Sequence, residues 1–456
     1  MKISHITIGL ICMKFDLSKD IAHIAEEWNQ ICFEKESPDE DVLIIYGPKG
    51  SEKTKAAQEL ARSRAGVFYF SFSGLTYGEA VQSFIRTYLS ESTDITTITD
   101  AVDAFMKKRS GKHTLIILED EKNDAMNECD KQFSRYINGK HAVILCNICK
   151  EDDYADHSVR IWRRSIAEFI KLFPDYDKND AIRLHALTGG MIDVAKDIDT
   201  NATYEENVRI LLEPDSAFST VLPAMVNECF RTPESYYPIL KSMADGHCRL
   251  SEIAKDVNFP NNKCLKYIEA LIENGFATAE KLEGSKASTY HLANTYFAAW
   301  SRYVYGRQMM QAVSPDALFQ YVKEDIDEHI TLPDFYAACL RFMQNANKHY
   351  NVEYKWGNIR ETKKAIPVEI GDDSTIIIDY YKETDEFSYN LIFPHSLDMK
   401  YSKEEIYRIY EALDKINSRY YAHTVIFSFT RFNDWCVSEA AQNEWFHIVP
   451  AERLKY

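Results

Sequence analysis

Short apolar runs alternate with amphipathic segments through the first third of this chain. Four runs are rich in β-branched and aromatic side chains and span residues 42–46, 67–71, 115–118 and 142–145. Helical patterns lie between them, as at residues 55–63 and 77–89. Continuous apolar runs of this length are typical of buried strands in a parallel sheet, whose strands are joined by helical crossovers. The alternation therefore predicts a three-layer α/β domain.

The loop after the first apolar run has a strongly constrained sequence. Its residues are Gly47-Pro48-Lys49-Gly50-Ser51-Glu52-Lys53-Thr54, and a predicted helix follows. A phosphate-binding P-loop reads G-x-x-x-x-G-K-[ST] in the same setting, between a strand and a helix. Every required position except the second glycine is matched. The segment predicts a P-loop; the alternative is an ordinary strand–turn–helix whose lysine and threonine match by chance.

Each matched position of this loop has an expected role in binding ATP and Mg²⁺. We expect Lys53 to reach the β- and γ-phosphate oxygens and the Thr54 hydroxyl to bind Mg²⁺. We expect the backbone N–H groups around Gly47, Gly50 and Ser51 to face the phosphates, together with the N-terminus of the following helix.

Glu52 is the residue that departs from the pattern. It adds a side chain where the backbone must approach phosphate, and its carboxylate is a negative charge beside negative oxygens. At ~5 Å and an effective dielectric of ~20, one such pair costs about 3 kcal/mol, roughly a hundredfold in affinity. The cost falls if the carboxylate turns to solvent. Two interpretations stay open: a weakened nucleotide site and a relic that no longer binds.

Acidic residues follow the third apolar run. A P-loop enzyme needs one carboxylate that holds Mg²⁺ through water and a second that polarises the attacking water. If the strand ends at Leu118, Glu119 takes the metal position and Asp120 the base position. If the strand is one residue longer, Asp120 and Glu121 take these positions instead. A charged strand exit in solvent is the alternative to both.

Asn147 is a further candidate, because it lies just beyond the fourth apolar run. Its amide could contact the γ-phosphate or the attacking water, although an asparagine at a strand end is more often a turn residue.

From about residue 160 helical periodicity replaces the strand pattern. Helices are predicted at residues 167–173, 180–187, 204–212 and 219–230, then at 236–245, 250–257 and 262–274. A two-stranded ribbon over 276–279 and 288–292 follows, and three helices with a ribbon are the plan of a winged helix. Beyond about residue 315 the pattern is α+β, with strands at 374–380, 388–393 and 423–427 and helices at 335–346 and 403–417.

The order of these features resembles the archaeal-type ATPase family of the AAA+/STAND P-loop NTPases. The resemblance covers nearly the whole chain and rests on residues 45–54, 115–121, 144–147, 163–164, 187–191, 236–240, 245–246, 271–275, 290–292 and 297–305. It implies an ATPase domain with a helical lid over residues 1–200, a winged-helix domain over 201–312 and a restriction-endonuclease-like α+β domain over 313–456. It also implies that Arg163 or Arg164 senses the nucleotide; the solvated start of a helix is the equally weighted alternative.

The C-terminal domain departs from that family at the residues that a nuclease needs. Such a core requires an Asp and, on the next strand, Glu-x-Lys. Asp379 is suitably placed, but Phe393-Pro394-His395 stand where Glu-x-Lys would be. Tyr336 occupies the position of a further helical acid. We therefore expect a degenerate domain without nuclease activity.

The charge balance opposes a general affinity for nucleic acids. Lys and Arg number 53 and Asp and Glu number 70, which gives a net charge of −17. On the presumed recognition helix, Lys263 and Lys266 are balanced by Glu269 and Glu273. A protein partner is favoured over DNA, which stays the less favoured alternative.

The cysteines and the apolar segments indicate in which cellular compartment the protein is expected. Ten cysteines are scattered singly apart from the pair Cys146 and Cys149, for which buried thiols are favoured over a metal site. No stretch approaches twenty apolar residues, and no secretory leader is recognisable. We expect a cytoplasmic protein that does not span a membrane.

The sequence as a whole predicts a degenerate AAA+/STAND-type ATP-binding protein. We expect a nucleotide-responsive module with weak or absent hydrolysis and no nuclease activity. Two alternatives stay open. One is an active ATPase that acts with or on nucleic acid, and the other is a purely structural interaction protein.

Overall fold

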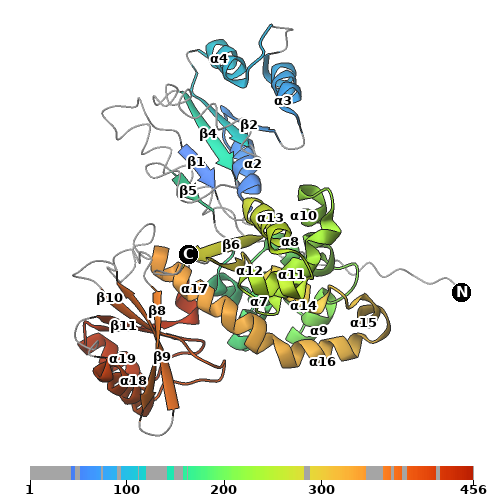
Figure 1. The fold of residues 1–456 in the computed structure, drawn as a ribbon. Helices are drawn as coiled ribbons and strands as arrows, with labels where there is room; N and C mark the ends of the chain where they lie inside the picture. The colour runs from blue at the N-terminus through green and yellow to red at the C-terminus, as the bar shows by residue number, and fades with distance from the viewer. Residues whose placement is uncertain are drawn as a thin grey trace, which may run out of the picture. The chain divides into compact units, whose positions relative to one another are not determined.

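The computed structural model describes most of the chain, as two compact units. The described residues are 43–46, 52–72, 75–89, 94–110, 112–119, 141–147, 158–161, 163–281, 288–345, 363–370, 374–382, 388–416 and 422–454. One unit lies within residues 14–163 and the other holds residues 164–456 (Figure 1). The three-domain division at residues 200 and 312 stays a prediction.

The first unit contains a five-stranded parallel sheet with the order β2-β3-β4-β1-β5. The strands are β1 (Leu43–Tyr46), β2 (Val67–Ser71), β3 (Thr114–Glu119), β4 (His141–Asn147) and β5 (Ser158–Arg160). The first four correspond to the predicted runs, whereas the sequence analysis missed β5. Strands β3, β4 and β1 are neighbours and run parallel, so their carboxyl ends lie side by side at one edge of the sheet.

Helices pack against this sheet. They are α2 (Lys53–Ser63), α3 (Tyr77–Phe84), the π-helical turn η1 (Ile85–Leu89) and α4 (Ile98–Lys108). One core joins α3, η1 and α4 to strands β2 and β3, with Phe84, Val102 and Ile116 fully buried. The fold of the unit fits the predicted α/β P-loop class.

The second unit begins with helices. They are α6 (Ile166–Leu172), α7 (Lys178–Thr188), α8 (Ile192–Ala195), α9 (Tyr204–Leu211), α10 (Ala217–Cys229), η4 (Pro233–Ser235), α11 (Tyr237–Ala244), α12 (Leu250–Asp256) and α13 (Asn261–Glu273). The antiparallel ribbon β6 (Ala277–Lys281) and β7 (Ser288–Leu292) follows. Then come α14 (Thr295–Tyr303), α15 (Gln308–Val313), α16 (Pro315–Ile326), η5 (Asp327–Thr331) and α17 (Leu332–Asn345). Helices α11 to α13 and the ribbon match the elements expected of a winged helix, an assignment that stays a prediction.

Helix α7 ends at a turn that only glycine can form. Gly189 and Gly190 have φ angles of 58° and 69°, a region that costs other residues energy. A Cβ atom on Gly190 would lie 2.3 Å from the carbonyl oxygen of Arg164, and one on Gly189 would overlap the Asn294 side chain. The helix predicted at residues 180–187 is therefore present as α7, and it ends at this Gly-Gly turn.

The second unit ends in a mixed sheet with the order β12-β11-β10-β9-β8 (Figure 1). Its elements are β8 (Lys363–Ile370), β9 (Ser374–Lys382), β10 (Ser388–Ile392), α18 (Lys403–Lys415), β11 (His423–Ser428), α19 (Asp434–Gln442), β12 (Phe446–Pro450) and η6 (Ala451–Arg453). Strands β8 to β10 are antiparallel, and β10 to β12 are parallel. Helices α18 and α19 share a core with this sheet, so the region is α+β as predicted.

No helix among the described residues is long and apolar enough to cross a bilayer.

Candidate functional site

The loop that the sequence predicts to bind phosphate enters the described part of the chain at Glu52. Gly47, Gly50 and Ser51 lie outside the described residues, and so does Asp120. The roles expected of these four residues stay predictions.

Glu52 has a backbone conformation that favours glycine. Its φ is 64° and its ψ is 19°, in the left-handed region. This conformation costs a residue with a Cβ atom about 1 kcal/mol or more, whereas a glycine adopts it freely. The Glu52 side chain is only 5% exposed, and its Oε1 lies 2.6 Å from the Lys55 Nζ. The structure thus adds a backbone strain and a neutralising partner that the sequence analysis did not foresee.

Lys53 and Thr54 are the first two residues of helix α2. Lys53 is 7% exposed and Thr54 is half-buried. The Thr54 hydroxyl donates a hydrogen bond to Oε1 of Glu119, 65 residues later in the chain. The fold therefore joins the loop's threonine to an acid that is a candidate for the metal position.

Glu119 is the last residue of β3 and is 3% exposed. The strand is one residue longer than the run at 115–118, yet the carboxylate that meets Thr54 is that of Glu119. Its second oxygen, Oε2, accepts a hydrogen bond from the hydroxyl of Tyr69 on β2. Both carboxylate oxygens are thus held by hydroxyl donors. The end of β3 at Glu119 is the strand end of the second predicted register, whereas the contact with Thr54 is made by the acid of the first. Which acid takes the metal position and which the base position stays a prediction.

Tyr69 is the residue of this cluster that the sequence analysis missed. Burial and the neighbouring Glu119 raise the pKa of its hydroxyl well above the usual value, and hydrogen bonds with Gln58 and Ser71 lower it by less. The hydroxyl therefore stays protonated and remains a donor. The Tyr88 hydroxyl donates to the Tyr69 carbonyl oxygen at 2.5 Å. A sequence signal for Tyr69 is lacking, because its contact crosses between strands.

Asn147 is the last residue of β4. The strand registers pair Asn147 with Tyr46 on β1, and Cys146 with Glu119 on β3. The backbone of Asn147 therefore lies at the same sheet edge as the end of β1, where the loop begins, and the end of β3. Its role toward a γ-phosphate stays a prediction. Cys149, the second cysteine of the pair, lies outside the described residues.

The two arginines belong to different units. Arg163 ends the first unit and is half-buried, whereas Arg164 begins the second and is 5% exposed. The Arg164 Nη1 lies 3.3 Å from Oε1 of Glu168, which caps the start of α6. Arg164 is therefore buried, which differs from the solvated helix start weighed as the alternative. The nucleotide-sensing role of either arginine stays a prediction.

A buried histidine joins the Arg164 segment to two helices of the second unit. The Nε2 of His185 lies 2.8 Å from the Arg164 carbonyl oxygen, and its Nδ1 lies 2.6 Å from Oδ2 of Asp334 on α17. The hydroxyl of Thr295 donates to the other Asp334 oxygen at 2.8 Å. Burial raises the pKa of Asp334, but the charge of His185 and these hydrogen bonds outweigh it and lower the pKa. The cluster is an interhelical connection.

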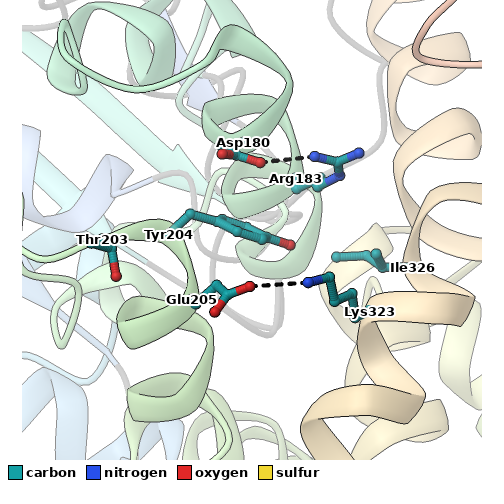
Figure 2. Close-up of a pocket in the computed structure, with 7 residues that line it drawn as sticks. All are labelled: Asp180, Arg183, Thr203, Tyr204, Glu205, Lys323 and Ile326. Carbon is teal, nitrogen blue, oxygen red and sulfur yellow. Dashed lines mark hydrogen bonds and ion pairs between the residues drawn. The ribbon is translucent and has the colours of Figure 1, made fainter.

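A pocket of about 410 Å³ lies between helices α7, α9 and α16 of the second unit and is open to solvent (Figure 2). It is lined by Asp180, Arg183, Thr203, Tyr204, Glu205, Lys323 and Ile326. Its cations are engaged with carboxylates: Arg183 contacts Asp180 and makes two 2.8 Å hydrogen bonds to Asp327, and Lys323 lies 3.0 Å from Glu205. The contacts of Arg183 with Asp327 and of Lys323 with Glu205 connect separate helices, which favours a structural role.

The C-terminal sheet places Asp379 against an aromatic residue. Asp379 on β9 is 4% exposed, and its Oδ2 accepts a hydrogen bond from the Tyr336 hydroxyl at 2.5 Å. The Phe393 ring lies 4.5 Å from the Tyr336 ring and stacks on Phe427 at 5.3 Å. The Asp379 carboxylate thus accepts from a tyrosine that packs against Phe393.

The exposed face of α13 carries both charges. Lys263, Lys266, Glu269 and Glu273 are all exposed, as the sequence pattern predicts for this helix. The Lys263 Nζ lies 4.1 Å from the centre of the Phe259 ring, in a cation–π contact.

The donors at the carboxyl edge of the first sheet suit Mg²⁺, which prefers hydroxyl and carboxylate oxygens and keeps several waters. The half-buried Thr54 carries a hydroxyl oxygen and the buried Glu119 carries a carboxylate, and the two groups are hydrogen-bonded. Among the described residues no group of three or more His, Cys, Asp or Glu could hold a metal ion by itself. The site fits a metal that arrives with a phosphate.

Comparisons with known proteins give distant similarities in structure. No family model matches the sequence, and no curated protein matches it. A Signal Transduction ATPase with Numerous Domains (STAND) protein with a tetratricopeptide repeat sensor, from Pyrococcus horikoshii, shares 12% identity at a TM-score of 0.29, over 74% of this chain and 48% of its own. PCH-2 of C. elegans shares 12% identity at a TM-score of 0.23, over 59% of this chain and 71% of its own. The similarity thus spans about half of the first neighbour. At these TM-scores, neither neighbour defines the fold of this chain.

Proposed function

We propose that this protein is a degenerate ATP-binding module of the AAA+/STAND type, which binds ATP with Mg²⁺ weakly and responds to it. The observation that carries the proposal is the hydrogen bond from Thr54 to Glu119. It joins the last residue of the loop pattern to an acid at the end of a neighbouring buried strand. This pairing is what nucleotide binding with a metal requires, and an ordinary strand–turn–helix has no need of it.

Each residue of the site has a definite task in this proposal. Lys53 would neutralise phosphate oxygens, the Thr54 hydroxyl would bind the metal directly, and Glu119 would hold a water of the metal. Bound Mg²⁺ would neutralise charge on the β- and γ-phosphates. Thr54 can keep its hydrogen bond to Glu119 while an oxygen lone pair faces the metal.

Glu52 accounts for the weak binding that we propose. Its left-handed backbone and its carboxylate stand where the loop pattern has glycine. The ion pair with Lys55 offsets part of the charge repulsion. The side chain nevertheless occupies space at the start of α2, where backbone N–H groups would approach phosphate.

Hydrolysis is slow or absent in this proposal. Both oxygens of Glu119 accept hydrogen bonds from hydroxyl groups, so this carboxylate is a poor candidate for a general base. Asp120 would then polarise water, which inverts the usual order of the two acids. Arg163 and Asn147 are the further candidates that would contact the γ-phosphate.

The other domains act through surfaces in this proposal. Mixed charge on α13 and the engagement of Lys263 with Phe259 favour a protein partner over DNA. The Tyr336–Asp379 pair stands where a nuclease of this plan would have two carboxylates, which supports the absence of nuclease activity.

Calorimetry with ATP and Mg²⁺ tests the proposal on the natural chain. We expect a dissociation constant in the millimolar range, and binding that the Lys53→Ala variant loses, because Lys53 contacts the phosphates. A micromolar constant would contradict the account of Glu52 as a lesion. Binding that is absent, or equally strong without Lys53, would contradict nucleotide binding at this loop.

A further inference from the structure

Three elements of the first unit meet at the Tyr69 hydroxyl. It donates to Oε2 of Glu119 on β3, and it has hydrogen bonds with Gln58 of α2 and Ser71 of β2. Thr54 of α2 donates to the other oxygen of the same carboxylate. Glu119 is 3% exposed, so solvent does not replace either donor. The carboxylate is therefore fixed at both oxygens, from two different elements.

A glutamate at this place needs two points of attachment. Its side chain has one more rotatable bond than that of an aspartate, so one hydrogen bond leaves the carboxylate free to pivot. A metal ligand, or the acid that orients a metal-bound water, is effective only when it is held close to its working position. The Tyr69 hydroxyl supplies the attachment that Thr54 alone cannot.

We propose that Tyr69 is a positioning residue for Mg²⁺ bound with nucleotide: it holds the Glu119 carboxylate in the orientation that the metal requires. This inference rests on the proposed function and adds a residue to it. Tyr69 does not contact the nucleotide. It acts through Glu119, in the way that a hydrogen-bond partner behind a metal ligand tunes metal affinity.

Removal of the hydroxyl should weaken binding of the metal and spare binding of the nucleotide. In the Glu52→Gly background, where we expect tighter binding, ATP affinity is measured by calorimetry in Mg²⁺ and in EDTA. For Tyr69→Phe we expect the enhancement by Mg²⁺ to fall by about tenfold, the size typical of losing such a partner. The affinity in EDTA should not change, because Lys53 and the loop backbone are intact.

Tyr88→Phe is the matched control. This variant also removes a tyrosine hydroxyl. The Tyr88 hydroxyl donates to the carbonyl oxygen of Tyr69 and not to Glu119. This control should keep the full enhancement by Mg²⁺. A second test is a double-mutant cycle: in a Glu119→Gln background, Tyr69→Phe should have no further effect on the enhancement.

The outcomes separate this inference from the proposed function. If the Glu52→Gly parent binds no ATP, the proposed function fails and the inference fails with it. If the parent binds and Tyr69→Phe retains its enhancement by Mg²⁺, the inference is overturned and the proposed function stands. Tyr88→Phe could lose as much of the enhancement by Mg²⁺ as Tyr69→Phe, or Tyr69→Phe could lose as much ATP affinity in EDTA as in Mg²⁺. Either result would show that Tyr69 has a structural role and would overturn the inference.

Discussion

At the scale of single residues, two polar contacts in the first unit depend on positions far apart in the sequence. Thr54 and Tyr69 reach Glu119 from α2 and β2. The Thr54–Glu119 contact could be predicted, because the loop pattern and the acidic strand end each have a known place in such a fold. The Tyr69 contact could not, because nothing in the sequence marks a tyrosine inside an apolar run as a hydrogen-bond donor. The left-handed backbone conformation of Glu52 could likewise not be predicted from the sequence.

A histidine pair in the C-terminal sheet gives a prediction on pH at this scale. His423 Nδ1 lies 3.0 Å from His447 Nε2. Burial, and then the neighbouring His423, lower the pKa of His447 to about 4. An unfolded histidine titrates near 6.5, so the unfolded state takes up the proton first as the pH falls. The stabilisation is complete above pH ~6.5 and is lost as the pH falls toward about 4.

We expect the natural chain to lose about 2 kcal/mol of folding free energy at this site between pH 7 and pH 5. Urea unfolding at the two pH values measures the loss, and His447→Gln should show a smaller one because it removes this titration. An equal pH dependence in the variant would contradict the assignment.

At the scale of elements, the strands that the sequence analysis missed share a position. Strands β5, β8 and β12 each lie at the edge of their sheet. Edge strands are short or carry polar residues and proline, since one side needs no partner. Pro367 lies within β8, and β5 has three residues. Central strands show the apolar runs of a buried sheet, which is why β1, β3 and β4 were predictable.

The Gly-Gly turn after α7 yields a prediction on stability. Gly190→Ala should destabilise the protein by about 2–4 kcal/mol, because its φ is 69° and a Cβ atom would lie 2.3 Å from the Arg164 carbonyl oxygen. Gly246→Ala is the matched control: its φ is 95° with nothing within 4 Å of the added atom, so only the backbone cost of about 1 kcal/mol applies. Thermal unfolding measures both. Equal losses would contradict the role of the close contact.

At the scale of the whole molecule, the described structure combines an α/β unit with a second unit that ends in an α+β sheet. The classes of these two regions followed from the sequence, because strand–helix alternation and its loss near residue 160 are visible in the pattern. The identities of the winged helix and the nuclease-like domain depend on resemblance, and they stay predictions.

The C-terminal sheet yields a prediction on activity. Purified protein with Mg²⁺ or Mn²⁺ should leave plasmid, linear and single-stranded DNA intact, because the predicted nuclease plan would place carboxylates where Tyr336 and Phe393 stand. Gel electrophoresis after incubation checks it. Cleavage that Asp379→Ala abolishes would show an active site in this sheet.

The central claim is that a working nucleotide site is weakened at Glu52. Glu52→Gly removes the carboxylate and the left-handed strain together, so folding should gain about 1 kcal/mol. Glu52→Gln removes the charge alone and keeps the strained backbone, which separates the two effects.

Calorimetry of ATP with Mg²⁺ on the folded Glu52→Gly variant tests that claim most directly. We expect affinity to rise by about tenfold to hundredfold over the natural chain, nearer to tenfold because Lys55 already neutralises part of the charge. An unchanged affinity in a folded variant would contradict the account and leave the loop as a relic in a protein that works through its surfaces.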